Sequence, residues 1–297
     1  MNASAPQVCF ICGAKEHHSI TASYWACADC GHETLRAGEG QAYIINDALD
    51  EKSLRRKDVL DRFRGAVLKR FSDGVKPVCL VDIGSASGKF LFHYGQRFER
   101  SLGIEITEAA VEFSRNVCRL HILPDVKAYD GMISVATCWH SLEHFPVSSL
   151  CGTLDSLNRQ LTSGGRVIVS VPNNRSWQYR IFREAYAYFD VPSHLHQFSP
   201  MSLRLLFERF GFRQAGFIVS WPYNMFGYVQ ALLNVMTGSH NYLYYRLKRR
   251  SAKPSIIKDL VHGMLLAIAI PMGVVLGVFD GVWPCRQGVI TACFERK

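Results

Sequence analysis

The chain has 297 residues, of which 48% are hydrophobic and 20% are charged. This length and composition allow one large domain with a small accompanying module, and they exclude a disulfide-stabilised miniprotein and a long disordered chain. The 34 Lys and Arg residues outnumber the 25 Asp and Glu residues, and the resulting net charge of +9 favours an anionic partner such as nucleic acid, a lipid headgroup or a phosphorylated substrate.

Four of the ten cysteines form two C-x-x-C-G turns near the N-terminus. A turn of this kind aims two thiolates at one ion, so two turns predict a tetrahedral structural zinc site; unrelated thiols or a redox pair are the alternative. The predicted ligands are Cys9, Cys12, Cys27 and Cys30. We expect a zinc ribbon over residues 1–40 with a short hairpin between the turns, and His32 exposed beside it. The first residues show no export signal, so we interpret the thiols as reduced and cytosolic.

The next segment predicts a lead-in to the main domain. Apolar spacing from Glu51 to Phe71 fits one amphipathic helix within a lead-in at 41–74, followed by a main domain at 75–221. That domain opens with an apolar run at 78–83, typical of a buried parallel strand, and a glycine turn at 84–88 leads into a helix.

The glycine turn and an acid after the second predicted strand indicate a nucleoside site. Gly84 and Gly88 allow a sharp turn that exposes backbone to a ligand, and Glu105 follows the strand at 101–104, where a carboxylate can bind both ribose hydroxyls. The glycines do not have the G-x-G-x-x-G spacing of dinucleotide enzymes. The pattern, with Asp82 at its start, resembles the class I S-adenosylmethionine-dependent methyltransferases, although Ala86 stands where a middle glycine is common.

This resemblance covers most of residues 75–220 and implies a Rossmann-like, doubly wound, mostly parallel α/β sheet whose last strand, 288–297, is antiparallel. Segments 130–137 and 164–173 look like the fourth and fifth strands of the family, and 189–212 resembles a subgroup that carries an N-terminal zinc ribbon. The implied cofactor is S-adenosylmethionine. Its predicted contacts are Asp82, Gly84, Ser85, Gly88, Glu105 and Trp139, with Asp125 only a weak candidate for the adenine.

Methyl transfer to a hydroxyl needs alignment and a base, and the predicted candidates follow the fourth strand. His140, Glu143 and His144 would share one face if a helix begins there. The corresponding positions in ubiquinone-type O-methyltransferases resemble a divalent-metal site, so a metal is possible here; helix capping by Glu143 and structural packing of His144 are the alternative. His194 is a further catalytic candidate, and His196 a weaker one that could instead bind backbone.

Residues 260–279 contain no formally charged side chain and could span about 30 Å as a helix. Because the chain then returns to the sheet, a single membrane crossing is disfavoured. Pro271 predicts a split helix that forms a monotopic or re-entrant hairpin, within a hydrophobic and basic insertion at 222–287. Aromatic and basic residues over 242–283 favour peripheral contact with an anionic membrane. A buried helix or a dimer interface is the alternative.

Together these features predict a cytoplasmic methyltransferase at the inner face of a membrane, with a hydroxyl of a saccharide or lipid-linked acceptor as its substrate. The saccharide rests on the family resemblance. Alternatives are O-methylation of a quinone or another small molecule, C-methylation of a sugar and, in a different class, a nucleic-acid-binding zinc-ribbon protein. Nucleic acid is not the expected partner, because the basic residues cluster beside the apolar segment rather than along an aromatic groove.

Overall fold

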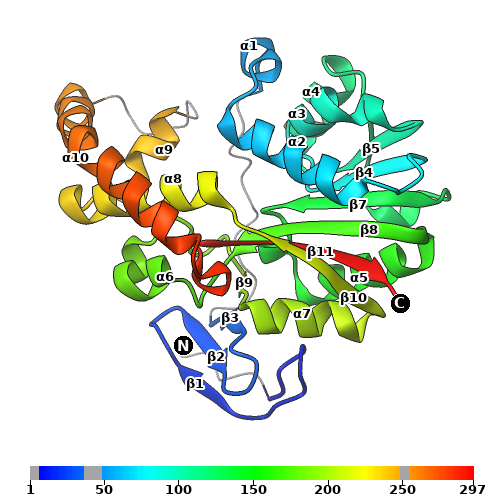
Figure 1. Ribbon diagram of the computed structural model, residues 1–297, viewed down its shortest axis with the longest axis horizontal. Coiled ribbons are helices and arrows are strands. Elements are labelled where there is room, and N and C mark those ends of the chain that lie inside the picture. Colours follow the sequence, from blue (N-terminus) through cyan, green and yellow to red (C-terminus); the bar gives the residue numbers. More distant parts are fainter. Residues whose placement is uncertain (1–6, 37–48, 248–254) are drawn as a thin grey trace.

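The computed structural model describes residues 7–36, 49–247 and 255–297, and its main body is a seven-stranded sheet in the order β10-β11-β8-β7-β4-β5-β6 (Figure 1). The strands are β4 (Cys79–Ile83), β5 (Arg100–Ile104), β6 (His121–Leu123), β7 (Ile133–Trp139), β8 (Leu161–Pro172), β10 (Phe212–Ile218) and β11 (Val289–Arg296). Strands β4 to β8 pair in parallel, whereas β11 runs antiparallel to both β8 and β10. The predicted Rossmann-like sheet with an antiparallel last strand is confirmed.

Two apolar cores cover the two faces of this sheet. Every residue of β4 and β7 is buried, which explains their continuous apolar sequences. One core packs α5 (Val147–Gln160) and α7 (Pro200–Arg209) against the sheet. The other core packs α2 (Val59–Ser72) and α3 (Lys89–Tyr94) on the opposite face, while α4 (Glu108–Asn116) lies between β5 and β6 in the chain. The sheet is therefore buried between helical layers.

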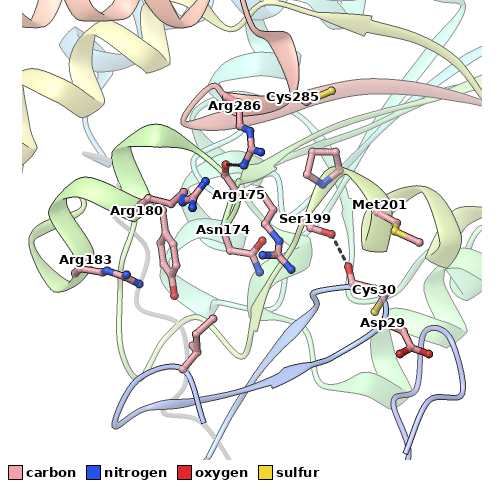
Figure 2. A pocket seen from close by; sticks show the side chains of 13 residues that line it. Asp29, Cys30, Asn174, Arg175, Arg180, Arg183, Ser199, Met201, Cys285 and Arg286 are labelled. Atoms are coloured by element: carbon pink, nitrogen blue, oxygen red, sulfur yellow. Dashed lines mark hydrogen bonds between the residues drawn. The ribbon is translucent and has the colours of Figure 1, made fainter. Parts of the chain in front are cut away.

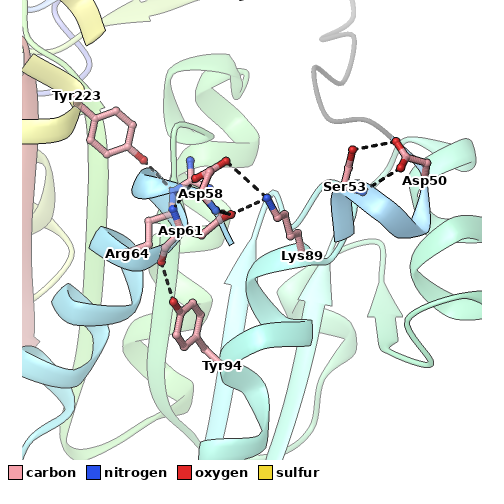
Figure 3. A network of polar contacts seen from close by, with 8 residues as sticks. All are labelled: Asp50, Ser53, Asp58, Asp61, Arg64, Lys89, Tyr94 and Tyr223. Atoms are coloured by element: carbon pink, nitrogen blue, oxygen red, sulfur yellow. Dashed lines mark hydrogen bonds and ion pairs between the residues drawn. The ribbon is translucent and has the colours of Figure 1, made fainter. Parts of the chain in front are cut away.

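The lead-in segment forms two helices, α1 (Glu51–Arg55) and α2, rather than the one predicted. The break arises because Asp58 starts a new helix: its carboxylate accepts from the Asp61 N–H (2.9 Å), and the Asp61 carboxylate accepts from the Asp58 N–H (3.0 Å). Lys89, the first residue of α3, lies 2.5 Å from Asp61 and 3.5 Å from Asp58 (Figure 3). These ion pairs connect α2 to the helix that follows the glycine turn.

The N-terminal module is a small antiparallel sheet of β1 (His17–Ser19), β2 (Tyr24–Cys27) and β3 (Glu33–Leu35), with the predicted hairpin between β1 and β2. Strand β9 (His196–Gln197) of the main domain adds to its edge. His32 is buried and not exposed as predicted, because its ring packs against His196 at this junction. The module is thus joined to the main domain through a shared sheet.

The C-terminal insertion lies between the last two strands and consists of α8 (Trp221–Thr237), α9 (Tyr242–Leu247) and α10 (Ile256–Asp280). The prediction of a hairpin within 260–279 is wrong, because α10 continues through Pro271 as one helix. The helical pair is formed instead by α8 and α10, which lie side by side in Figure 1. Their close packing depends on two glycines of α10 that have no side chain. A Cβ on Gly273 would come within 2.5 Å of Val229 Cγ2, and one on Gly277 within 2.7 Å of Met225 Cγ.

Candidate functional site

The glycine turn lies at the carboxyl end of β4 and depends on left-handed backbone. Gly84 has φ 74° and Gly88 has φ 73°, and a Cβ on either would come within 2.5 Å of a neighbouring side-chain carbon. Ala86, where the family commonly has glycine, also has a positive φ of 48°. This left-handed alanine costs about 1–2 kcal/mol. The buried Ser85 hydroxyl has no hydrogen-bond partner among the described residues.

Glu105 links the glycine turn to the end of β5. Its Oε2 accepts from the Ala86 N–H (2.9 Å), and its Oε1 accepts from the N–H groups of Ile106 (2.9 Å) and Thr107 (2.8 Å). A carboxylate oxygen can accept two hydrogen bonds, so Oε2 retains capacity for a ligand hydroxyl. The carboxylate therefore holds the turn in shape and can still bind a ribose.

Two other predicted cofactor residues are buried at the ends of neighbouring strands. Asp82 of β4 accepts a 2.6 Å hydrogen bond from Thr137 Oγ1 of β7, which fixes its carboxylate. Trp139, the last residue of β7, is only 6% exposed and packs on Phe90 with ring centroids 5.3 Å apart. Trp139 is thus part of the apolar core behind the turn, and its role at the cofactor stays a prediction.

Asp125 follows β6 at the same carboxyl edge of the sheet. Its Oδ1 accepts from the Lys127 N–H (2.9 Å), so the side chain caps the short helical turn Val126–Ala128. Its contact with an adenine stays a prediction.

His140 and Glu143 are brought together directly after β7. His140 has a left-handed φ of 54°, a strained backbone of the kind found at functional sites, and its Nδ1 lies 3.3 Å from Glu143 Oε1. Its ring packs on Tyr188 and Tyr223, at centroid distances of 5.6 and 4.8 Å. Burial, with a smaller effect of Arg64, lowers the pKa of His140 to about 3, so its ring is neutral at pH 7.

His144 turns away from His140 and faces His194 instead. The segment Leu142–His144 is a single 3-10 turn, and α5 begins only at Val147, so the shared helical face predicted for 140–144 does not form. The His144 and His194 ring centroids lie 4.6 Å apart, and ligand atoms of Glu143, His144 and His194 all lie within 4.8 Å of one another. Burial lowers the pKa of both histidines to about 4 and raises that of the fully buried Glu143.

The tautomer of His144 follows from its partner. A carbonyl oxygen only accepts, so His144 Nδ1 carries the proton that it donates to the Ser193 carbonyl (2.9 Å). In the neutral ring, Nε2 then carries the lone pair. His144 is partly exposed, whereas His194 is buried and its Nδ1 has no partner among the described residues.

His196 lies outside this cluster and serves the junction between the two sheets. Its Nε2 donates to the Phe145 carbonyl (2.9 Å), so its Nδ1 accepts from His32 Nε2 (3.2 Å). Both ring nitrogens therefore satisfy structural contacts, as the alternative interpretation of this residue expected.

The comparisons with known proteins show the family of the chain. The sequence model of a family described as a methyltransferase domain matches residues 55–214, which is more than half of the chain. The chain belongs to this methyltransferase family. It is an S-adenosylmethionine-dependent methyltransferase of class I, and the predicted family is confirmed. No curated protein matches the sequence.

The chain is similar to several solved structures at low sequence identity. A protein from Galdieria sulphuraria assigned as a sarcosine dimethylglycine methyltransferase has a TM-score of 0.50 and 11% identity, over 85% of this chain and 92% of its own. A methyltransferase from Clostridium acetobutylicum has a TM-score of 0.48 and 8% identity, over 81% and 92%. One from Archaeoglobus fulgidus has 0.46 and 17%, over 83% and 97%.

The four predicted zinc ligands of the methyltransferase converge in the N-terminal module. Cys9 Sγ lies 3.7 Å from Cys30 Sγ, Cys12 Sγ lies 3.5 Å from Cys27 Sγ, and all four sulfur atoms lie within 4.8 Å of one another. Tetrahedral zinc with Zn–S bonds of about 2.3 Å requires sulfur atoms about 3.8 Å apart. The donor set and its spacing fit one zinc ion with no open position for substrate.

Sequence reasoning missed the residues that surround His140. Arg64 of α2 donates through Nε to the Tyr223 hydroxyl (2.7 Å), as Figure 3 shows, and Tyr188 donates to the Tyr223 carbonyl (2.7 Å). These side chains come from the lead-in, the segment before β9 and the C-terminal insertion. No local spacing could have indicated their contact, because it is created by the packing of α2 against α8.

Proposed function

We propose that this methyltransferase transfers a methyl group to a hydroxyl of a membrane-proximal saccharide or lipid-linked acceptor. The observation that carries the proposal is the cluster of Glu143, His144 and His194 after β7. Strand β7 is the direct neighbour of β4, whose carboxyl end bears Asp82 and the glycine turn. A base and a cofactor site on adjacent parallel strands suit proton removal beside methyl transfer.

Gly84, Ser85, Gly88 and Glu105 are the residues that would hold the cofactor, through exposed backbone of the turn and the carboxylate that accepts from it. Bound S-adenosylmethionine supplies an activated methyl group. Asp82 and Trp139, which are buried at the ends of β4 and β7, are proposed as further cofactor contacts.

The proposed base is His144. Its Nε2 lone pair takes the proton of the acceptor hydroxyl, and the Ser193 carbonyl, which accepts from Nδ1, stabilises the imidazolium that results. Glu143 lies close enough to oppose the new positive charge, and His194 orients the ring at 4.6 Å. His140, with its low pKa and its contact with Glu143, is proposed to align the acceptor as a neutral hydrogen-bonding group.

A second candidate function follows from the same three residues. One carboxylate and two imidazoles within 4.8 Å are a ligand set that divalent transition metals accept, and a metal there would favour quinone-type O-methylation. Paramagnetic resonance of added Mn²⁺ tests this: immobilised Mn²⁺ that is released in a Glu143→Gln variant supports the metal, and free Mn²⁺ in the unaltered protein excludes this ion from the cluster.

We propose that α10 gives the enzyme its membrane contact at the cytoplasmic face. Among the described residues, α10 is the one helix that is both long enough and apolar enough to cross a membrane. Only 22% of its most apolar stretch is buried in the protein. Its buried positions form one narrow face: His262, Ala269, Gly273, Gly277 and Asp280. The large apolar side chains elsewhere on it are exposed, including Leu260, Met264 and Val275 at 62%, 69% and 68%.

Charge near this helix is partly neutralised. Arg246 pairs with Asp259 at 2.8 Å, and Lys258 lies over the Tyr242 ring. The other basic residues of segment 242–283, which are Lys248, Arg249, Arg250 and Lys253, lie outside the described residues. Cosedimentation with phosphatidylcholine vesicles, with and without phosphatidylglycerol, tests the contact. Val275→Ser should weaken binding, Val59→Ser on α2 should not, and no binding of the unaltered protein to either vesicle overturns the proposal.

The cofactor site is tested by calorimetric titration with S-adenosylmethionine and S-adenosylhomocysteine. Glu105→Ala removes the carboxylate that binds the turn, so we expect loss of measurable binding, whereas the exposed Glu108→Ala serves as the matched control. Equal affinity in Glu105→Ala and the unaltered protein would falsify the assignment. Radiolabelled methyl transfer to saccharide phosphates and lipid extracts then identifies the acceptor.

A further inference from the structure

A cavity of about 500 Å³ separates the zinc-ligand module from the C-terminal end of the insertion. Its charged lining includes four arginines, Arg175, Arg180, Arg183 and Arg286, and a single acid, Asp29. Figure 2 shows these side chains around the cavity. Asp29 and Cys30 of the zinc-ligand module lie on one side, and Cys285 and Arg286 lie on the other. The volume lies within the range of small-molecule sites.

The arginines are held near one another, and two of them, Arg175 and Arg183, interact electrostatically with the buried Glu33. Arg180 and Arg286 both lie over the ring of Trp177, at 5.7 and 5.4 Å, and Arg286 donates to the Arg175 carbonyl (3.2 Å). Among the described residues, none of the four arginines forms an ion pair. Four guanidinium groups that repel one another in one cavity are stabilised when a polyanion binds.

The nearest buried carboxyl does not cancel this charge. Glu33 contacts Tyr179, whose hydroxyl donates to Glu33 Oε2 (2.7 Å). Burial raises the pKa of Glu33 to about 7, so near neutral pH it carries less than a full negative charge. The cavity therefore keeps a clear positive excess.

A neutral polar group in the lining indicates more than a simple anion. Asn174 is only 4% exposed, and its Nδ2 donates to the carbonyls of Gly31 (2.7 Å) and Gln197 (3.2 Å). Its Oδ1 has no partner among the described residues, and this buried acceptor requires a donor such as a hydroxyl. Phosphate groups facing the arginines and a hydroxyl facing Asn174 describe a sugar phosphate.

The cavity is placed to serve the reaction site and the exposed helix together. Asn174 follows the carboxyl end of β8, and His140 follows the carboxyl end of β7, its parallel neighbour. On the other side, Arg286 comes shortly after the exposed apolar residues Phe279, Val282 and Trp283 at the end of α10.

We propose that this arginine cavity binds the diphosphate of a diphosphate-linked saccharide, and so anchors the acceptor for methylation. This inference deepens the proposed function and rests on it in one respect, because it takes the bound saccharide to be the methyl acceptor. Binding of the diphosphate in the cavity does not itself depend on catalysis. The diphosphate can come from a nucleotide sugar or from a lipid-linked saccharide, and both present the same phosphates and hydroxyls to the cavity.

The test is calorimetric titration of the full chain with inorganic pyrophosphate, UDP-glucose and geranyl diphosphate. Arg180→Gln/Arg286→Gln removes two charges that lie over the Trp177 ring, and Arg70→Gln, on an exposed position of α2, is the control. We expect the double variant to weaken pyrophosphate binding about tenfold or more, while Arg70→Gln leaves it unchanged. If the double variant does not fold, Arg183→Gln replaces it.

The relative affinities of the three ligands distinguish the possible sources of the diphosphate. Tighter binding of UDP-glucose than of pyrophosphate supports a nucleotide sugar, and tighter binding of geranyl diphosphate supports a lipid-linked source. Equal pyrophosphate affinity in the arginine variant and the control, or no binding of any of the three ligands, overturns the cavity proposal. Titration with S-adenosylmethionine in the same samples keeps the two ideas apart, since a failed cavity with intact cofactor binding leaves the proposed methylation standing.

Discussion

The cysteine cluster and the histidine cluster of this methyltransferase differ in how the chain assembles them. Each pair of cysteines is set by a turn of four residues, and the two turns are joined by one hairpin. The histidine cluster instead joins Glu143 and His144 to His194, about 50 residues further along the chain. A site made by local turns is visible in spacing, whereas a site made by packing is visible only when its parts meet.

The largest effect is expected where the local site is broken. Cys30→Ser removes one of the four predicted zinc ligands from a module with little core of its own, and a structural zinc contributes about 10–16 kcal/mol to such a fold. We expect loss of one zinc per chain by mass spectrometry and rapid proteolysis of residues 7–36. Cys285→Ser, at an exposed thiol outside the cluster, is the control. Full zinc content in Cys30→Ser would show that the four thiols do not act together.

The packed site is broken by His144→Ala. Loss of a general base lowers methyl transfer by about 10²–10⁴-fold, and S-adenosylmethionine affinity should stay within twofold because His144 is not among the predicted cofactor contacts. His121→Ala, at an exposed histidine on β6, is the matched control. An unchanged turnover in His144→Ala would mean either that His194 is the base or that the reaction needs no base.

The next largest effect is expected when the pH is lowered, because the histidine cluster titrates. His144 and His194 have folded-state pKa values of about 4, below the unfolded value of 6.5, so the unfolded chain gains protons first as pH falls. The free energy of unfolding should therefore decline between pH 6.5 and 4, by about 3 kcal/mol for each such histidine. Glu143, whose pKa burial raises, offsets part of this loss. Denaturant titration at several pH values, compared with His144→Gln, measures the slope.

The smallest effect is expected at the junction. His196→Ala leaves the Phe145 carbonyl and His32 Nε2 without their partner, which should cost about 1–3 kcal/mol of stability. Methyl transfer should change far less than in His144→Ala, and zinc should remain bound. Thermal unfolding with zinc analysis checks both, and a loss of turnover as large as that of His144→Ala would make His196 part of the reaction site.

Local sequence determined much of this protein. The apolar runs of β4 and β7, the glycine turn and the four cysteines depend on interactions within a few residues, so their patterns indicated the fold, the family and the thiol cluster. The helix predicted over 51–71 was wrong because a capping box at Asp58, also a local feature, was not taken into account.

Only the tertiary structure decided which side chains meet. His140 is turned by a left-handed backbone toward Tyr188 and Tyr223, and His194 replaces it beside His144. Likewise, α10 continues through Pro271 as one helix, and Gly273 and Gly277 let it pack closely along α8. The arginine cavity joins residues from α6 (Trp177–Phe182), the ribbon and the segment after α10. Such contacts depend on the free energy of packing between distant segments, which no local spacing records.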